Sequence, residues 1–238
     1  MMEDAARELV RAARRIVAFS GAGLSAESGV PTFRDADTQG FWVKYDPQKL
    51  ATPEGFTADP ELVYNWYNDR RRNITTVQPN PAHRALAARP NIVSVTQNID
   101  DLLHRAGAEK VVQLHGTLTA DRCHGGCGHE ETVDLADPPP LRSCPQCGAW
   151  LRPAVVWFGE MLPMDVWEEA EEVCRRCDLM LVIGTAAEVY PAAGLIGLAR
   201  TGGARIIVIN PKPSGASAVA DVELAGKAGE LLPSLLEE

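Results

Sequence analysis

"IVAFSGAGLSAESGVPTFRD", residues 16–35, begins as an apolar, β-rich run and passes directly into a segment with three glycines. A glycine pair straight after a strand lets backbone amides approach a phosphate group closely. The spacing from Gly23 to Gly29 is too long for the common dinucleotide fingerprint, and Phe41 and Trp42 stand where an acidic, ribose-binding residue is expected. The stretch alone therefore leaves two interpretations open: a nucleotide site, or a plain turn between a strand and a helix.

Short apolar runs recur along the rest of the chain. They lie at 15–19, 91–96, 111–114, 179–183 and 205–209. Helical patterns lie between several of them, at 81–88, 101–105, 166–176 and 190–200. This alternation predicts an α/β fold with a doubly wound parallel sheet and helices on both faces.

Two stretches break the alternation. Residues 36–80 are aromatic and punctuated by prolines, with helical pieces and no good strand, and residues 120–152 are rich in cysteine, glycine and proline. We expect these two stretches to form a second, smaller domain. The larger domain would then comprise residues 1–35, 81–119 and 153–238. In a doubly wound fold, a ligand would lie between the smaller domain and the strand ends.

Charge and hydropathy argue against several classes of protein. The formal net charge of the 238 residues is −9 and the isoelectric point is near 5.1. Such a chain has no general affinity for nucleic acid or anionic membranes, because phosphate binding needs clustered positive charge. Residues 1–15 follow a helical pattern without a secretory signal, and no apolar run is long enough to span a bilayer. We expect a cytoplasmic monomer that binds neither nucleic acid directly nor membranes.

Polar side chains follow two of the predicted strands. The run at 91–96 delivers Gln97, Asn98 and Asp100 at its carboxyl end, where an open α/β sheet binds ligands. These groups could hold ribose hydroxyls or a carboxamide, or Asn98 and Asp100 could simply cap the following helix. His115 ends another strand, and its ordinary pKa of about 6.5 suits a general base, although a lone histidine is more often structural.

All six cysteines lie between residues 123 and 177. Two pairs, in the sequences CHGGC and CPQC, have glycine or proline at or beside the turn and are separated by sixteen residues. They are Cys123 and Cys127, followed by Cys144 and Cys147. Four thiolates at this spacing predict one tetrahedral Zn²⁺ with no open position, and therefore a structural metal. Cys174 and Cys177 lack turn residues, and we expect them to be buried structural thiols.

Seven motifs together resemble one family. They are GAGLSAESGVPTFRD, TQNID, LHG, the two cysteine pairs, VVWFGE at 155–160, GTAAEVYPA at 184–192 and IN at 209–210. Their order is that of sirtuins, the NAD-dependent protein deacylases, and the resemblance covers nearly the whole chain. It implies a Rossmann-like NAD domain and a small zinc-ribbon and helical domain. The acyl-lysine of a protein substrate would enter the cleft between them.

The resemblance also implies roles for individual residues. His115 and Asn98 would be catalytic. Contacts to NAD would come from Gly21, Ala22, Gly23, Glu27, Phe33, Arg34, Gln97, Asn98, Asp100, Gly184, Thr185 and Asn210. Residues 154–160 would pair with the substrate peptide like an added strand, so that Val155, Trp157, Phe158 and Gly159 contact the substrate.

The chemistry implied by the resemblance has two stages. The acyl carbonyl oxygen attacks the C1′ carbon of the ribose and expels nicotinamide. His115 then takes a proton from a ribose hydroxyl, which attacks the acyl group, and the products are free lysine, nicotinamide and O-acyl-ADP-ribose. One departure from the family is Ala186, which stands where a serine is usual and removes a hydroxyl that could contact NAD.

The segment at 50–72 carries the prediction of acyl specificity. Tyr67 and Arg70 are three residues apart in a helical pattern, so both could face one carboxylate, although the spacing alone favours a solvated helix surface. In class III sirtuins, a Tyr-x-x-Arg pair binds the distal carboxylate of succinyl-, malonyl- or glutaryl-lysine. A small alanine, matched here by Ala51, leaves room for the longer group. The resemblance therefore implies a desuccinylase that retains deacetylase activity.

Two other functions stay open at this point. A mono-ADP-ribosyltransferase would use the same NAD pocket and the same early chemistry. A binding module that senses NAD and uses its zinc ribbon to contact a partner is a third reading. The full TQNID motif together with His115 counts against that third reading.

Overall fold

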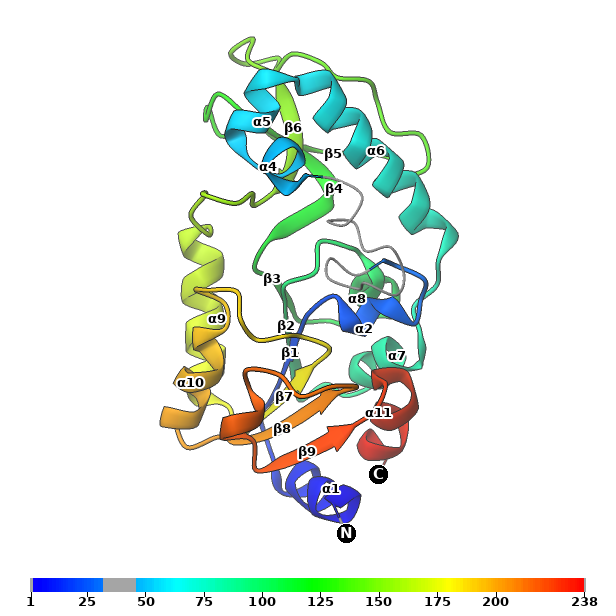
Figure 1. Cartoon of the computed structure of the whole chain (residues 1–238), viewed down its shortest axis with the longest axis vertical. Helices are drawn as coiled ribbons and strands as arrows, with labels where there is room; N and C mark the ends of the chain where they lie inside the picture. Colours follow the sequence, from blue (N-terminus) through cyan, green and yellow to red (C-terminus); the bar gives the residue numbers. More distant parts are fainter. Residues whose placement is uncertain (1, 32–45, 238) are drawn as a thin grey trace.

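A computed structural model describes residues 2–31 and 46–237 (Figure 1). Its larger sheet has six strands in the order β3-β2-β1-β7-β8-β9, and every neighbouring pair is parallel. The strands are β1 (Ile16–Ser20), β2 (Ile92–Thr96), β3 (Val111–Gln113), β7 (Leu179–Ile183), β8 (Arg205–Asn210) and β9 (Val222–Ala225). Every residue of β1 and β7 is buried, as expected for central strands covered on both faces. The predicted parallel sheet is confirmed.

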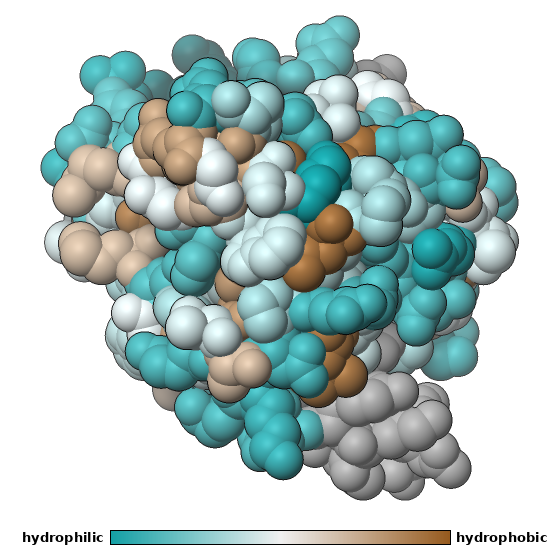
Figure 2. Space-filling model, turned by 90° about the horizontal axis from the view of Figure 1, so that it is seen from above, coloured by the Kyte–Doolittle hydropathy of each residue, from teal (hydrophilic) through white to brown (hydrophobic). Residues whose placement is uncertain are grey.

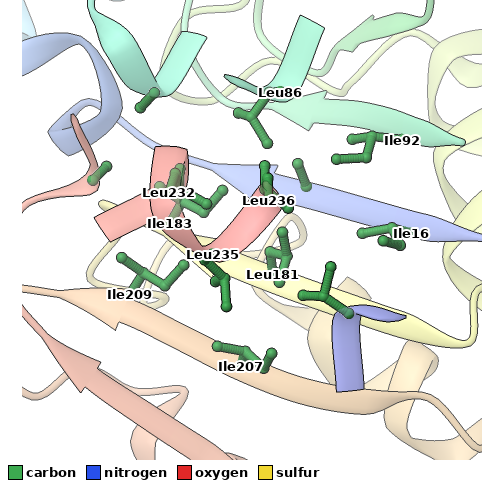
Figure 3. Packing of buried hydrophobic residues seen from close by; sticks show 14 of the residues in the cluster. Ile16, Leu86, Ile92, Leu181, Ile183, Ile207, Ile209, Leu232, Leu235 and Leu236 are labelled. Carbon is green, nitrogen blue, oxygen red and sulfur yellow. The ribbon is translucent and has the colours of Figure 1, made fainter. Parts of the chain in front are cut away.

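Helices cover both faces of this sheet. Alternate residues of β1 belong to different core clusters: Ile16 and Ala18 pack on one face, and Val17 and Phe19 on the other. The first face is covered by α1 (Met2–Ala12), α7 (Pro81–Ala87) and α11 (Ala228–Leu236), and the second by α9 (Met164–Arg176) and α10 (Gly194–Thr201). Figure 3 shows Leu232, Leu235 and Leu236 of α11 directed at the strands of the first face.

A second, antiparallel sheet lies at the upper end of the molecule in Figure 1. Its order is β5-β4-β6, and its strands are β4 (Gly116–Cys123), β5 (Glu130–Thr132) and β6 (Leu151–Val155). Three helices accompany it: α4 (Pro47–Leu50), α5 (Pro53–Ala58) and α6 (Pro60–Thr76). Each of these helices begins with a proline that follows a side-chain N-cap, supplied by Asp46, Thr52 and Asp59 respectively.

Within the described residues, the remaining short helices are α2 (Gly23–Ala26), α8 (Leu102–Arg105) and the 3₁₀ helix η1 (Ser217–Val219). The helix expected over 190–200 begins only at Gly194, after turns at 190–193. Pro191 accounts for the exclusion of Tyr190 from the helix, because a proline disfavours helical geometry in the residue before it. The sequence patterns also missed β9 and α11 at the carboxyl end of the chain.

The surface is largely polar where Figure 2 displays it, and the hydrophobic residues there form separate patches. Among the exposed large hydrophobic side chains are Phe158, Met161 and Met164, between the end of β6 and the start of α9. Within the described part of the chain, no helix combines the length and the hydropathy that crossing a membrane requires.

Candidate active site

An open pocket lies beside the loops that follow β1 and β2. Its lining residues are Ala22, Ser25, Gly29, Val30, Pro31, Arg70, Asn73, Ile74, Val77, Asn98, Ile99, Asp100 and Leu118. The loops at the carboxyl ends of parallel strands are where open α/β sheets bind ligands. The pocket brings together Ala22, Asn98 and Asp100, which we predicted to contact NAD, and Arg70 of α6, which we predicted to read the acyl group.

A buried chain of hydrogen bonds fixes the polar groups of this pocket. The Ser25 hydroxyl donates to Asp100 (2.9 Å) and accepts from the Asn98 side-chain amide (3.1 Å). His83 Nε2 lies 3.4 Å from the same hydroxyl, while its Nδ1 accepts from the Asn80 backbone. Burial lowers the pKa of His83 to about 4 and raises the pKa of Asp100. The imidazole is therefore neutral, and its proton lies on Nε2.

The sequence analysis did not identify Ser25 or His83 as part of the site. Ser25 lies inside the glycine-rich stretch, so its position after a strand was a usable signal. His83 sits in the first turn of α7, where its side chain completes a capping box with Asn80. Nothing in the sequence connects that helix end to the loop after β1.

His115 follows β3 and is half-buried. Its Nδ1 lies 3.0 Å from the Gln97 backbone carbonyl, which can only accept a hydrogen bond. Nδ1 must therefore carry the proton, and Nε2 keeps a free lone pair. Burial lowers the pKa of His115, although the contact with Gln97 opposes that effect. The result is a neutral imidazole near pH 7 whose Nε2 can accept a proton.

Two glycines of the opening stretch allow neighbouring loops to meet. A Cβ atom on Gly23 would lie 2.6 Å from the Gly184 Cα, and one on Gly21 would lie 2.8 Å from the Thr185 Cβ. The Gly23 amide donates to the Gly184 carbonyl (2.8 Å), and the Gln97 side chain donates to the Thr185 hydroxyl (3.1 Å). The glycines thus bring the ends of β1 and β7 together.

The other residues predicted to contact NAD are scattered. Asn210, at the end of β8, donates to the Thr185 carbonyl (3.3 Å), which places it beside the same loop. Glu27 is exposed and accepts from the Gly229 amide at the start of α11 (2.7 Å), so here its carboxylate fastens that helix and does not line the pocket. Phe33 and Arg34 lie outside the described residues.

The residues predicted to bind the acyl group lie together. Ala51, Tyr67 and Trp157 belong to one buried cluster, and the Phe158 amide donates to the Ala51 carbonyl (2.9 Å). Arg70 lies one turn after Tyr67 on α6, with its guanidinium carbon 5.9 Å from the centre of the Tyr67 ring. Burial lowers the pKa of the Arg70 guanidinium and raises the pKa of the Tyr67 phenol. The environment is therefore one in which a charged arginine gains from an anionic ligand.

The segment predicted to pair with a substrate peptide begins in β6, an edge strand of the smaller sheet. Val155 is buried at its end, and Phe158 beyond it is half-exposed. Gly159 has a φ of +86°, and the Glu160 carboxylate closes this turn by accepting from the Trp157 amide (2.8 Å). Among the strands that the structure describes, β6 pairs only with β4. The Leu151 amide of β6 also donates to the Arg142 carbonyl (2.9 Å), and pairing of this segment with an extended peptide stays a prediction.

The four cysteines predicted to bind zinc form one cluster. The sulfur atoms of Cys123, Cys127, Cys144 and Cys147 all lie within 4.8 Å of one another. The Cys123 and Cys147 sulfurs are 3.3 Å apart, and those of Cys127 and Cys144 are 3.6 Å apart. Tetrahedral zinc with bonds of about 2.3 Å requires sulfur atoms separated by about 3.8 Å. The donor set fits one zinc ion with all four positions filled, so the metal would be structural.

Replacing Cys144 with alanine is expected to remove this metal. Metal analysis of the wild-type chain should give about one zinc per chain, and the variant should retain less than about a fifth of that amount and melt at a lower temperature. Cys177→Ala, which alters a buried thiol outside the cluster, is the matched control and should keep its zinc. Full zinc content in Cys144→Ala would contradict four-thiolate ligation.

The chain is similar to proteins of one known family. Residues 21–191 match the Sir2 family. A relative from Ralstonia nicotianae, named NAD-dependent protein deacylase, is 49% identical, and the match covers 97% of this chain and 94% of the relative.

Solved structures agree in fold. One described as a complex of a Sir2 homolog with NAD is 43% identical, has a TM-score of 0.91, and matches over 99% of this chain and 93% of that one. A second, a Sir2 variant with a deacetylated p53 peptide and 3′-O-acetyl ADP ribose, is 31% identical, with a TM-score of 0.85 and coverage of 98% and 96%. The first complex contains NAD, and the second contains a peptide together with an acetylated ADP-ribose.

Proposed function

The chain belongs to the Sir2 family, and on that premise we propose that it is an NAD-dependent protein-lysine deacylase. Its preferred substrates would be lysines carrying acyl groups that end in a carboxylate, succinyl or malonyl, with acetyl as a poorer one. The observation that carries the activity is His115, whose Nδ1 is held by the Gln97 carbonyl so that Nε2 is free to act as a base.

Residues of this chain would bind and orient the reactants. When bound, NAD supplies an electrophilic ribose carbon and nicotinamide as a leaving group. Asn98 and Asp100, both held by Ser25, present amide and carboxylate groups to the pocket. His115 Nε2 would take the proton of a ribose hydroxyl, and that hydroxyl would then attack the acyl group that is being transferred. One water molecule would be consumed, and free lysine, nicotinamide and O-acyl-ADP-ribose would be released.

The proposed acyl preference rests on Tyr67 and Arg70. A carboxylate at the end of the acyl chain would pair with the buried Arg70 guanidinium and accept a hydrogen bond from the Tyr67 phenol. A neutral acetyl group would offer neither interaction, so it would gain nothing from the Arg70 charge or the Tyr67 hydroxyl. Ala51 supports this reading, because its small side chain lies in the same buried cluster as Tyr67.

Replacing Arg70 with methionine is expected to lower kcat/KM for a succinyl-lysine peptide by about 100-fold and for the matched acetyl peptide by about threefold. Nicotinamide and acyl-ADP-ribose should be measured together. Arg72→Met is the control, because Arg72 forms an exposed pair with Asp69 on the same helix. Equal losses on both peptides would rule out carboxylate recognition by Arg70.

The two alternative functions are not favoured. A mono-ADP-ribosyltransferase would leave ADP-ribose attached to a protein, whereas the proposed reaction releases O-acyl-ADP-ribose, so product analysis separates them. A module that only senses NAD would release no nicotinamide from NAD and an acyl peptide. The name NAD-dependent protein deacylase, which these relatives share, supports deacylation over both alternatives.

We also propose that the enzyme acts as a cytoplasmic monomer and binds neither nucleic acid directly nor membranes. The net charge of −9 does not suit polyanionic partners. Thiolates that serve as metal ligands are typical of a reducing compartment.

A further inference from the structure

The phenol of Tyr67 makes one hydrogen bond with a side chain from a different part of the fold. The Trp157 indole nitrogen lies 2.9 Å from the Tyr67 hydroxyl oxygen. Both side chains are almost completely buried, at 3% and 2% exposure. Tyr67 comes from α6 and Trp157 from the turn after β6, so the contact joins the acyl-reading helix to the proposed peptide-binding segment.

The direction of this hydrogen bond is determined by chemistry. An indole N–H can only donate, so the Tyr67 oxygen must be the acceptor. Burial raises the pKa of Tyr67, which keeps the phenol protonated and able to donate its own proton. Among residues 2–31 and 46–237, the structure gives no acceptor for that proton. The Trp157 contact therefore turns the phenol so that its O–H points away from the indole.

The indole is itself held firmly. The Arg152 guanidinium carbon lies 3.9 Å from the centre of the Trp157 ring, in a cation–π arrangement. The Phe56 ring packs at 5.3 Å from the same ring. The Trp157 backbone amide donates to Glu160, which also pairs with Arg152. Because the Trp157 ring and backbone are both held in place, the indole N–H points in one direction, toward the Tyr67 hydroxyl oxygen.

We propose that Trp157 is a positioning residue for acyl selectivity: its indole N–H orients the Tyr67 phenol as a hydrogen-bond donor to the distal carboxylate of the acyl group. The inference rests on the proposed function and assigns the Trp157 side chain a role in acyl selectivity in addition to its place beside the substrate peptide. An acetyl methyl group cannot accept this proton, so the orientation favours acyl chains that end in an acceptor. The effect should appear mainly in KM for the carboxylate-bearing substrate.

The test removes the indole N–H while keeping a ring. Trp157→Phe should raise KM for a succinyl-lysine peptide about fivefold, with a change in KM for the acetyl peptide of less than about twofold. Tyr67→Phe should lower succinyl kcat/KM about tenfold in the wild-type background and only about twofold in the Trp157→Phe background, because the two residues act as a unit. Trp150→Phe, which alters a half-exposed indole, is the control.

A second replacement at position 157 distinguishes loss of the N–H hydrogen bond from loss of side-chain packing. β-(3-benzothienyl)alanine at position 157 keeps the shape of indole and replaces the N–H with sulfur, and it should reproduce the KM effect at an unchanged melting temperature. If wild type does not prefer succinyl to acetyl peptides, the proposed function fails first. If wild type has that preference and both replacements retain it, or if Tyr67→Phe costs the same in both backgrounds, the role of Trp157 is overturned and the proposed function stands.

Discussion

Replacing Asp121 with asparagine is expected to lower the free energy of unfolding by about 3 to 5 kcal/mol. Asp121 is fully buried, and one of its carboxylate oxygens lies 2.7 Å from the equally buried Arg71 guanidinium. Its other oxygen accepts from the Tyr64 phenol (2.5 Å) and faces Arg142 at 3.0 Å. An asparagine would leave the Arg71 charge buried without its carboxylate. In a chain of this size, the melting temperature should fall by about 6 to 20 °C.

The matched control is Asp69→Asn on the exposed face of α6. Asp69 pairs with Arg72 at 3.0 Å, but both side chains are at least half-exposed, so the change should stay within about 0.5 kcal/mol. The double variant Arg71→Met, Asp121→Leu should be less destabilised than the sum of the two single changes, because it removes both buried charges. A melting temperature for Asp121→Asn within about 2 °C of wild type would contradict the argument.

This ion pair also bears on the site. Arg71 donates to the carbonyls of Leu118 and Ala120 in β4, as well as to Asp121. It thus fastens α6 to the strand that begins immediately after His115. Tyr67 and Arg70 lie on the same helix, so their distance from the reacting groups depends on contacts that no local sequence pattern reveals.

The regular part of the fold was predictable because its signals are local. β1 and β7 are continuous apolar runs, as strands buried on both faces must be, and glycine or polar residues follow each of them. β9 and α11 were missed for an equally physical reason. β9 contains Glu223 and so lacks a continuous apolar run, and α11 contains Pro233, which weakens its helical signal. Packing of Leu232 and Leu235 on the sheet overrides that local cost.

Site residues were predictable where the residue type and its spacing in the sequence are themselves required by the chemistry. His115 and the four cysteines stand out in the sequence because bases and metal ligands need particular atoms at particular spacings. Ser25 and His83 did not stand out, since their meeting depends on how α7 packs against the loop after β1. The contact between Trp157 and Tyr67 spans ninety residues of sequence and became visible only in the fold.

Replacing His115 with alanine is expected to lower kcat/KM for deacylation by about 100- to 10,000-fold, the range for loss of a general base. Burial holds the pKa of His115 below its ordinary value. The wild-type rate should therefore be constant through neutral pH, where Nε2 is unprotonated. It should fall about tenfold per pH unit once the pH drops below that pKa, because protonated Nε2 cannot accept a proton. This acidic limb should be absent in His115→Ala.

Two measurements make this prediction specific. Exchange of labelled nicotinamide into NAD should decline less than formation of free lysine, because the proposed base acts only after nicotinamide has left. His104→Ala is the control, since His104 is exposed on α8 and should leave both rates and the pH profile unchanged. If His115→Ala kept the acidic limb, the titrating group would have to be another one, and the partly buried Asp100, whose pKa is raised, would be the first to examine by substitution with asparagine.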